Sequence, residues 1–392
     1  MDRSLKDEIS AFIKANAEAQ LRFVIDLCNE NSYTYNIPGT NRVAEMVLEQ
    51  LGGLFPQHEI NEQTEVGDHH ILRMRAAGEW SCRRSIYLLG HMDTVFPPDH
   101  SFQKCKREGD WLIGPGTGDM KGGLAVIVYA LKTLGHFGLM DRLDLTLILS
   151  GDEEIGSITS HSLYEVERER ARACLVAECA GPQGEVVISR NGKAGARLDC
   201  FGKDSHVARV AAKKASAIVE LAHKIVALEA LNGNHPGVTV NVGKIEGGLG
   251  PCTVPAHASC LLDMRWSDEK QGKGLLQDAG RISQDRINRQ CRCELTILNQ
   301  RPAMAATEEN EKMFGVLRQL AEPLGMSLTA EYRRGTSDAN YFGAAGVPTL
   351  DGLGPICEGD HTSHERIIIS SLATRTALLA FFLNRLGADN SL

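Results

Sequence analysis

The stretch Leu145-Thr-Leu-Ile-Leu-Ser-Gly-Asp-Glu-Glu-Ile-Gly156 decides the fold class, because an apolar run of strand length ends directly in consecutive acids. Similar apolar runs stand at 85–90 and 173–177, and helical patterns lie at 42–51 and 122–134. Continuous apolar strands between amphipathic helices are typical of a mostly parallel sheet covered on both faces. The first 185 residues therefore predict an α/β domain.

The pattern changes near Asn191. Strand-like and helical segments then follow in an α+β order: 196–201, 211–231, 238–245, 258–266 and 274–288. After Arg301 the alternation of helices and strands resumes. We therefore predict one discontinuous α/β domain formed by residues 1–190 and 302–392, with a smaller α+β domain of residues 191–301 inserted into it.

Composition excludes several classes of protein. The chain has 392 residues, 43% of them hydrophobic, and a formal net charge of −8. Its Lys and Arg residues are scattered, so we predict no nucleic-acid partner and no membrane partner. Its apolar runs are far shorter than the ~20 residues of a membrane-spanning helix, and its first residues lack the apolar core of a secretory signal, which predicts a cytoplasmic location. Eleven cysteines without a CxxC pair are compatible with reduced thiols, so any metal should use oxygen and nitrogen ligands.

A histidine and an aspartate end the apolar strand in Ile86-Tyr-Leu-Leu-Gly-His-Met-Asp-Thr-Val95. Residues two apart leave a strand on the same face, so Asp93 can hold one ring nitrogen of His91 while the other nitrogen binds a metal. A strand-end histidine that is only hydrogen-bonded would be equally consistent with this segment.

The segment Gly114-Pro-Gly-Thr-Gly-Asp-Met-Lys-Gly-Gly123 stands before an apolar helix but lacks the spacing of a phosphate-binding loop. Its glycines allow a sharp bend that could aim Asp119 into a site, where both carboxylate oxygens could bridge two cations. An ordinary helix N-cap is the alternative interpretation of Asp119.

Further acids and histidines follow strands. The acids after Ser150 lie where α/β active sites form, and adjacent Glu153 and Glu154 can point in different directions, one to bind metal and one to act as a general base. A solvated loop is the alternative. Glu178 ends another apolar strand, and a loop before the last helix contains His361 and His364. An HxxH pair alone does not identify a site.

Taken together, the segments GHMDTVFP, GPGTGDMKGG, SGDEEIGS, VAECA and GDHTSHE occur in the order and approximate spacing of a known family. From about Leu21 to its end the sequence resembles the zinc-dependent family of glutamate carboxypeptidase, acetylornithine deacetylase and succinyl-diaminopimelate desuccinylase, and it is most similar to the glutamate carboxypeptidase branch. The resemblance implies a zinc-exopeptidase-like catalytic domain, formed by 1–190 and 302–392, and an inserted lid and dimerisation domain, 191–301.

The resemblance also implies two zinc ions, for which cobalt or manganese could substitute. The matching ligands are His91, Asp119 and Glu178 for one ion and Asp119, Glu154 and His361 for the other, with Asp119 as the shared bridge. His361 is preferred to His364 because the family places a Glu four residues after the ligand, as Glu365 is here. Two imidazoles and three carboxylates suit a pair of borderline divalent ions on chemical grounds as well.

By the same resemblance, Glu153 matches the general base, Asp93 matches the carboxylate that supports His91, and the bond after Asp119 is expected to be cis. The two ions would polarise the amide carbonyl, while Glu153 would accept a proton from water and pass it to the leaving amine.

The inserted domain contributes further matches. His206 matches a histidine that reaches into the partner subunit's active site and helps to stabilise the oxyanion, which implies a homodimer. Asn241, Arg265 and Arg301 match positions that bind the substrate carboxylate or the lid, although exposed arginines often contact only solvent. The sequence departs from the family pattern at five positions: Ala208, Ala211, Lys214, Ser216 and Cys252. These changes leave the substrate and the lid geometry open.

The function implied is hydrolysis of an amide or peptide bond next to a free carboxylate. The substrate would be a small peptide or an N-acyl amino acid, and the leading hypothesis is an exopeptidase that removes a carboxyl-terminal residue such as glutamate. One alternative is an N-acyl-amino-acid deacylase. A second alternative is a catalytically silent metal-binding or interaction protein, against which the acid pair Glu153-Glu154 argues, because such a protein needs no free base.

Overall fold

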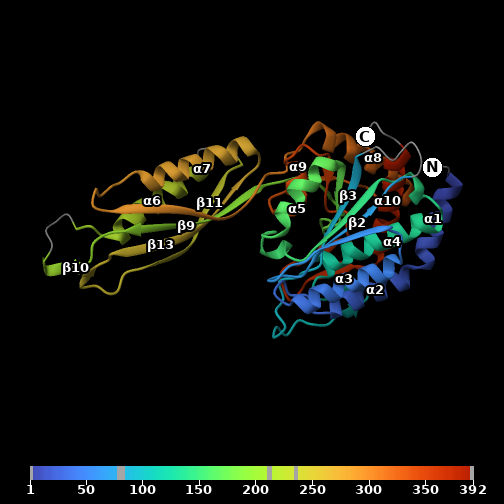
Figure 1. The fold of residues 1–392 in the computed structure, drawn as a ribbon, viewed down its shortest axis with the longest axis horizontal. Coiled ribbons are helices and arrows are strands. Elements are labelled where there is room, and N and C mark those ends of the chain that lie inside the picture. The colour runs from blue at the N-terminus through green and yellow to red at the C-terminus, as the bar shows by residue number, and fades with distance from the viewer. Residues whose placement is uncertain (1–2, 77–83, 210–213, 234–236, 389–392) are drawn as a thin grey trace. The chain divides into compact units, whose positions relative to one another are not determined.

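The computed structural model describes residues 3–76, 84–209, 214–233 and 237–388. The chain divides into two compact units (Figure 1). Unit 1 contains Met1–Ser189, Ala306–Arg333 and Ser337–Leu392, and unit 2 contains Arg190–Ala305 and Arg334–Thr336. Each unit has its own hydrophobic core.

Unit 1 is built around a six-stranded sheet with the order β1-β2-β6-β3-β7-β16. Its strands are β1 (Gln57–Asn61), β2 (His69–Met74), β3 (Ser85–His91), β6 (Leu145–Ser150), β7 (Ala171–Val176) and β16 (Thr349–Leu350). β6, β3, β7 and β16 are parallel, whereas β1 and β2 are antiparallel to their neighbours. The predicted α/β class with a mostly parallel sheet is confirmed.

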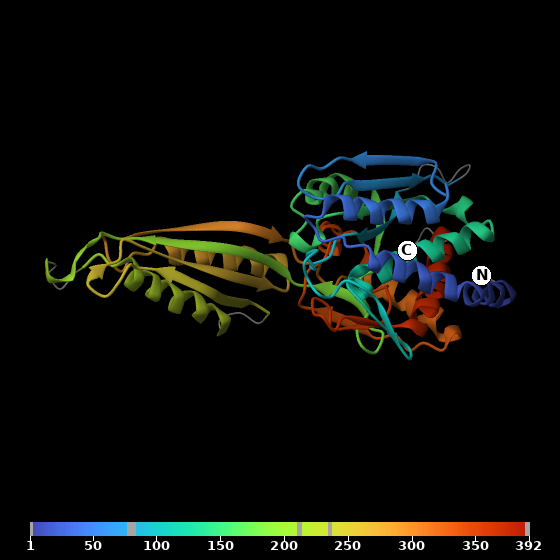
Figure 2. The same ribbon diagram turned by 90° about the horizontal axis from the view of Figure 1, so that it is seen from below.

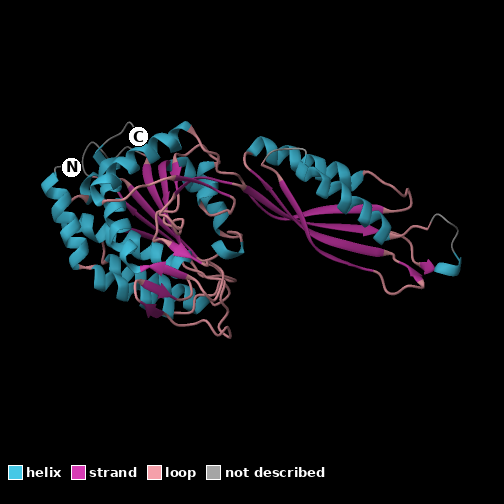
Figure 3. Ribbon diagram, turned by 180° about the vertical axis from the view of Figure 1, so that it is seen from behind, coloured by secondary structure: helices cyan, strands magenta, loops and turns pink. Residues whose placement is uncertain are grey.

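Helices cover both faces of this sheet, as Figure 3 shows. Tyr87 of β3 packs against Phe342 of α9 with ring centroids 5.2 Å apart. Gly90 faces α4 instead, where an added Cβ would lie 2.6 Å from Leu124 Cδ2. Because side chains alternate along a strand, α9 and α4 lie on opposite faces. The helices of unit 1 are α1 (Arg3–Ala15), α2 (Ala17–Asn29), α3 (Ile37–Leu51), α4 (Gly122–His136), α5 (Ser160–Glu167), α8 (Glu308–Ala321), α9 (Ala339–Gly343) and α10 (Ile369–Ala388).

α4 is the central helix of its face. It is 15 residues long, is buried along most of that length, and contacts α2, α3 and α10. Its apolar character therefore belongs to the interior of unit 1. Among the described residues, the structure contains no helix with both the length and the hydropathy that crossing a membrane would require.

Short strands complete unit 1. An antiparallel sheet has the order β17-β18-β5-β4, and β8 (Val186–Arg190) pairs with β15 (Ala330–Arg333). The strands of the antiparallel sheet are β4 (Lys106–Glu108), β5 (Trp111–Ile113), β17 (Cys357–Glu358) and β18 (Arg366–Ile368). Because β17 and β18 pair with each other, the intervening loop 359–365 has both ends fixed to a sheet.

Unit 2 has a four-stranded antiparallel sheet with the order β11-β13-β9-β14, and α6 and α7 pack together and against it (Figures 1 and 2). Burial alternates residue by residue along β9, which is typical of a sheet covered on one face. Its elements are β9 (Gly192–Phe201), β10 (Ser205–His206), α6 (Ala217–Glu229), β11 (Thr239–Gly247), β12 (Thr253–Val254), β13 (His257–Trp266), α7 (Glu269–Gln284) and β14 (Arg292–Arg301).

The helix predicted at 211–231 begins later. Ser216 is its N-cap, with an extended backbone and a side-chain oxygen that accepts from Val219 N at 3.4 Å, so α6 starts at Ala217. A serine in this position satisfies a backbone donor that has no partner inside the helix. Residues 211–213, including Ala211, lie outside the described residues.

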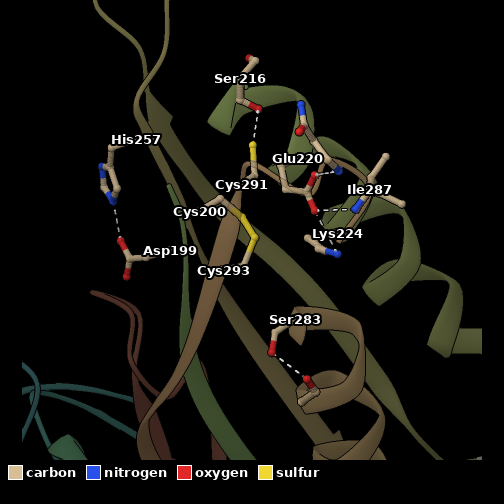
Figure 4. The surroundings of a disulfide bond; sticks show 12 residues. Asp199, Cys200, Ser216, Glu220, Lys224, His257, Ser283, Ile287, Cys291 and Cys293 are labelled. Atoms are coloured by element: carbon tan, nitrogen blue, oxygen red, sulfur yellow. Dashed lines mark hydrogen bonds and ion pairs between the residues drawn. A yellow bond between two sulfur atoms is a disulfide. The ribbon is translucent and has the colours of Figure 1, made fainter. Parts of the chain in front are cut away.

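Cys200 and Cys293 form a disulfide between β9 and β14 (Figure 4). They stand directly opposite each other in the strand register, with Cα atoms 4.2 Å apart. This pair differs from the expectation of reduced thiols. The pairing of β9 with β14 brings the two sulfurs together, and the spacing of cysteines in the sequence does not reveal that pairing.

Near the disulfide, the buried Glu220 accepts hydrogen bonds from Ile287 N and Asn288 N. These bonds connect α6 to the segment after α7.

Candidate metal centre

The carboxyl ends of three parallel strands bring polar residues to one edge of the sheet in unit 1. His91 is the last residue of β3 and stands in register with Ser150, the last residue of β6. The turn Glu153–Ile155 follows β6, and Glu178 follows β7. Because parallel strands end at the same edge, residues far apart in the sequence meet there.

A bent loop between β5 and α4 carries Asp119 to the same place. Gly116 has a φ of 73°, in the left-handed region that favours glycine, and the peptide bond from Asp119 to Met120 is cis, as the resemblance implies. At Gly123 a Cβ would lie 1.8 Å from Ala177 O, so only glycine lets α4 begin this close to the end of β7.

Glu365 holds this loop in place, a role that the sequence did not reveal. Its carboxylate accepts from Gly116 N at 3.1 Å, from Gly118 N at 2.8 Å and from Asp119 N at 3.1 Å. Burial, followed by the nearby Asp119 carboxylate, raises the pKa of Glu365 to about 7, although the three loop N–H groups act in the opposite direction. The sequence marked Glu365 only by its spacing from His361, because its partners lie about 250 residues earlier.

Asp119 stands between the two histidines. Its Oδ1 lies 2.9 Å from His91 Nε2, and its Oδ2 lies 3.0 Å from His361 Nε2. One carboxylate oxygen therefore faces each imidazole, which is the arrangement that a bridging ligand between two cations requires.

A second carboxylate accompanies each histidine. Glu178 Oε1 lies 3.5 Å from His91 Nε2, and Glu154 Oε2 lies 3.1 Å from His361 Nε2. Neighbouring ligands of a tetrahedral ion with bonds of about 2.0 Å are roughly 3.3 Å apart, so these separations fit zinc. His91, Asp119 and Glu154 offer ligand atoms that all lie within 4.8 Å of one another. The residues therefore fit a pair of divalent ions.

Asp93 connects the first histidine to the acid pair. Its Oδ1 lies 3.3 Å from His91 Nδ1, and its two oxygens accept from Glu153 N and Glu154 N, each at 3.2 Å. Thr34 Oγ1 donates to the same carboxylate at 2.7 Å. Asp93 thus leaves His91 Nε2 directed at the centre and positions the backbone of both glutamates. Thr34 was not predicted, since an isolated threonine before the first strand carries no recognisable signal.

Electrostatics favour cations at this centre. Burial, followed by the Asp119 carboxylate, raises the pKa of Glu178 to about 8 and raises that of Glu154 well above its usual range. The pKa of Asp119 itself lies well below its usual range, because hydrogen bonds from His361 and His91 outweigh its burial. Hydrogen bonding to Asp119, then to Glu154, raises the pKa of His361 to about 11. Buried carboxylates this close to one another need positive charge, which protonated histidines or metal ions can supply.

The two glutamates of the acid pair occupy different positions. Glu154 directs its carboxylate to His361, whereas Glu153 begins the turn Glu153–Ile155, and its carbonyl accepts from Gly156 N at 2.8 Å. The two histidines of loop 359–365 also differ. His361, with a φ of 59°, reaches Asp119 and Glu154, whereas His364 is exposed and its backbone N–H donates to Thr362 Oγ1.

The other four predicted site residues belong to unit 2, and the structure describes them within that unit. His206 is exposed, and its Nδ1 accepts from Ala208 N at 3.2 Å. Asn241 is exposed on β11, Arg265 donates to Asp263 Oδ1 and to Arg334 O, and Arg301 is buried at the end of β14. That these four residues bind substrate or assist catalysis at the metal centre of unit 1 stays a prediction.

The chain is similar to known proteins over most of its length. A model of "Peptidase family M20/M25/M40" matches residues 87–385. Carboxypeptidase G2 of Pseudomonas sp. (strain RS-16) is 27% identical over 327 residues, which are 82% of this chain and 78% of that protein. A succinyl-diaminopimelate desuccinylase of Nitrosococcus oceani is 29% identical over 304 residues, 72% of this chain and 78% of that protein. The crystal structure of aminopeptidase PepT from Bacillus cereus ATCC 10987 has the same fold, with a TM-score of 0.76, 22% identity, and coverage of 95% of this chain and 99% of that one.

Proposed function

Because the chain belongs to peptidase family M20/M25/M40, whose members are metal-dependent peptidases and related hydrolases, we propose that it is a dizinc hydrolase that cleaves an amide or peptide bond next to a free carboxylate. The observation that carries the proposal is the placement of Asp119, with one oxygen toward His91 and the other toward His361. A carboxylate used in this way is typical of a two-metal hydrolytic site.

The residues of unit 1 divide the chemistry among them. Bound zinc ions would supply Lewis-acid polarisation of the scissile carbonyl and of the attacking water. Glu153 would accept the proton from that water and deliver it to the leaving amine. Asp93 supports this step indirectly, because its backbone oxygen, 3.1 Å from His91 Nδ1, and its carboxylate fix the tautomer of His91, and the carboxylate holds the backbone N–H of Glu153.

The proposed substrate is a small peptide or an N-acyl amino acid with a free carboxylate. Carboxypeptidase G2 and the succinyl-diaminopimelate desuccinylase bear names that describe a carboxypeptidase and an N-succinyl hydrolase, which supports this class of substrate. An arginine of unit 2, Arg265 or Arg301, is the proposed carboxylate anchor, since a guanidinium binds a carboxylate through two parallel hydrogen bonds. Asn241 is proposed to assist at the same subsite.

A substrate panel tests this function. We expect the zinc-loaded protein to hydrolyse members of a panel of acetyl-, succinyl- and benzoyl-amino acids and dipeptides, with glutamate among the released residues. Amidation of the substrate's free carboxylate should lower kcat/KM by about 100-fold or more, because the anchoring arginine then has no charged partner. The measurement is amine release with each substrate and its matched amide.

The pattern of hydrolysis separates the alternatives. Turnover of dipeptides supports an exopeptidase, whereas turnover of the acyl-amino acids alone would exclude a peptidase and favour a deacylase. If the metal-loaded protein hydrolyses no member of the panel, the proposed enzyme is wrong and a metal-binding or interaction protein is the better description.

We also propose that the protein acts as a homodimer through unit 2. β11 is an edge strand, and its exposed Ile245 lines a shallow hollow together with the exposed Ile218 of α6; the two side chains are 61% and 44% accessible. If β11 pairs antiparallel with its copy about Ile245, Lys244 meets Glu246 of the partner subunit, so the edge is self-complementary in charge. The pairing would also cover these two exposed apolar side chains.

Mixing two inactive variants tests the dimer and His206 together. His206→Ala and Glu153→Gln should each be nearly inactive, yet the mixed dimer would contain one complete site if His206 acts across the interface. After subunit exchange we expect the mixture to recover about a quarter of wild-type activity, since half of the dimers are mixed and each has one competent site. Activity of the mixture is followed together with its mass by light scattering.

The control places Ile245→Glu in both chains, which should give monomers and prevent the recovery. Val166→Glu changes an exposed apolar residue of α5 and should leave both dimerisation and recovery unchanged. A monomeric wild-type protein at micromolar concentration, or recovery that persists in the Ile245→Glu background, would contradict the proposal.

A further inference from the structure

Asp338 is a buried carboxylate next to the metal centre that the proposed chemistry does not use. It stands immediately before α9 and is 3% exposed. Its Oδ1 accepts from Ser157 Oγ at 2.5 Å, and its Oδ2 accepts from Tyr164 OH at 2.5 Å and from Ser150 Oγ at 3.1 Å. An ionised carboxylate is an acceptor only, so three converging hydroxyl donors match its chemistry.

Two of these donors mark the ends of one short segment. Ser150 is the last residue of β6, and Ser157 follows the turn that carries the acid pair. Between them, Gly156 N donates to Glu153 O and Ser157 N donates to Asp152 O, each at 2.8 Å. Both ends of the segment 150–157 are therefore bonded to the same side chain.

The conformation of Ser157 depends on a contact of this kind. Its φ is 54°, a left-handed value that residues other than glycine rarely adopt unless the surrounding structure holds them there. The short hydrogen bond from Ser157 to Asp338 is a specific interaction that can do so. Without this hydrogen bond, Ser157 would lose the contact that holds the end of the loop after Glu153 and Glu154.

We propose that Asp338 is a positioning residue that clamps the two ends of the segment 150–157 and thereby fixes where Glu153 and Glu154 stand. Asp93 holds the same segment through the two backbone N–H groups, and Asp338 holds it through the two serine side chains. The structural claim stands alone, and its kinetic consequence rests on the proposed function.

Hydrogen exchange of the metal-free protein tests the clamp without reference to activity. In Asp338→Asn a neutral amide replaces the charged carboxylate and one of its acceptor oxygens, so the hydrogen bonds to the serines weaken and the segment opens more often. We expect the amides of Glu153 and Glu154 to exchange about 10-fold faster or more, with the strands of the sheet unchanged. Ser157→Ala should have the same local effect, which provides a second variant if the first folds poorly.

Asp144→Asn is the matched control. Asp144 is a buried carboxylate just before the other end of β6, where it accepts from Ala76 N. Its substitution should leave exchange at Glu153 and Glu154 unchanged. Unchanged exchange there in Asp338→Asn and Ser157→Ala, or an increase spread evenly through unit 1, would overturn the proposal.

Kinetics then distinguish positioning from general stability. For zinc-loaded Asp338→Asn and Ser157→Ala we expect kcat to fall about 10-fold or more with KM changed less than about threefold, because the acid pair is displaced and substrate binding is not. The double variant should fall little further than either single variant. Tyr164→Phe removes a donor outside the segment and should affect thermal stability more than kcat. Equal losses of kcat in all three single variants would overturn the clamp. An inactive wild type would refute the proposed function, and the hydrogen-exchange result alone would then decide whether Asp338 clamps the segment.

Discussion

Glu153→Gln is expected to lower kcat by roughly 10²- to 10⁴-fold while two metal ions stay bound. The amide is nearly the same size as the carboxylate but cannot accept the proton of the attacking water. The backbone N–H of residue 153 still donates to Asp93, so the segment keeps its conformation. Metal content by mass spectrometry, measured beside the rate on the best panel substrate, checks both parts of the expectation.

Two comparisons make this result specific. Glu154→Gln alters the adjacent carboxylate that reaches His361, and it should lower metal content as well as rate. Glu165→Gln alters an exposed glutamate of α5 and should change neither. If Glu153→Gln keeps more than about a tenth of wild-type kcat, Glu153 is not the general base and the division of roles within the acid pair is wrong.

Much of the centre could be predicted because its residues stand at recognisable places. His91 ends one apolar strand and Glu178 follows another, and the end of an apolar run is visible in the sequence. Asp119 lies among glycines, which in such a loop indicate a sharp bend or a close approach of the backbone. The choice of His361 over His364 needed the family pattern, since nothing in two exposed loop histidines separates them.

Other features could not be predicted because their partners are distant in the sequence. Glu365 binds N–H groups of a loop about 250 residues earlier, and Asp338 binds hydroxyls of Ser150 and Ser157 more than 180 residues earlier. Acids and serines are common on surfaces, so their contacts become visible only in the fold. Short strands were missed for another reason: β17 and β18 have too few residues to show a period.

Asp119→Asn should remove the bridge and with it the stable binding of two ions. An amide offers one oxygen, and its nitrogen cannot bind a cation. Residue 119 can then bind the ion beside only one of the two histidines, and it no longer bridges the two ions. The remaining carboxylates, Glu154 and Glu178, stand beside different histidines and cannot replace it. We expect fewer than two zinc ions per chain after dialysis and a fall in kcat of roughly 10³-fold or more, because two bound ions would be needed to polarise the carbonyl and the water together.

The same loss should be visible in thermal stability. Zinc at about 100 times its dissociation constant stabilises a folded protein by about 2.7 kcal/mol per site, so the wild type should unfold several degrees higher with zinc than after chelation. Asp119→Asn should lose most of this zinc-dependent shift, because the ions that neutralise the buried carboxylates no longer bind together. His364→Ala changes the exposed histidine of the same loop and should keep two ions, the full shift and the wild-type rate. Asp119→Asn protein that retained two zinc ions and the full shift would show that Asp119 is not the bridge, and the assignment of one oxygen to each ion would fail with it.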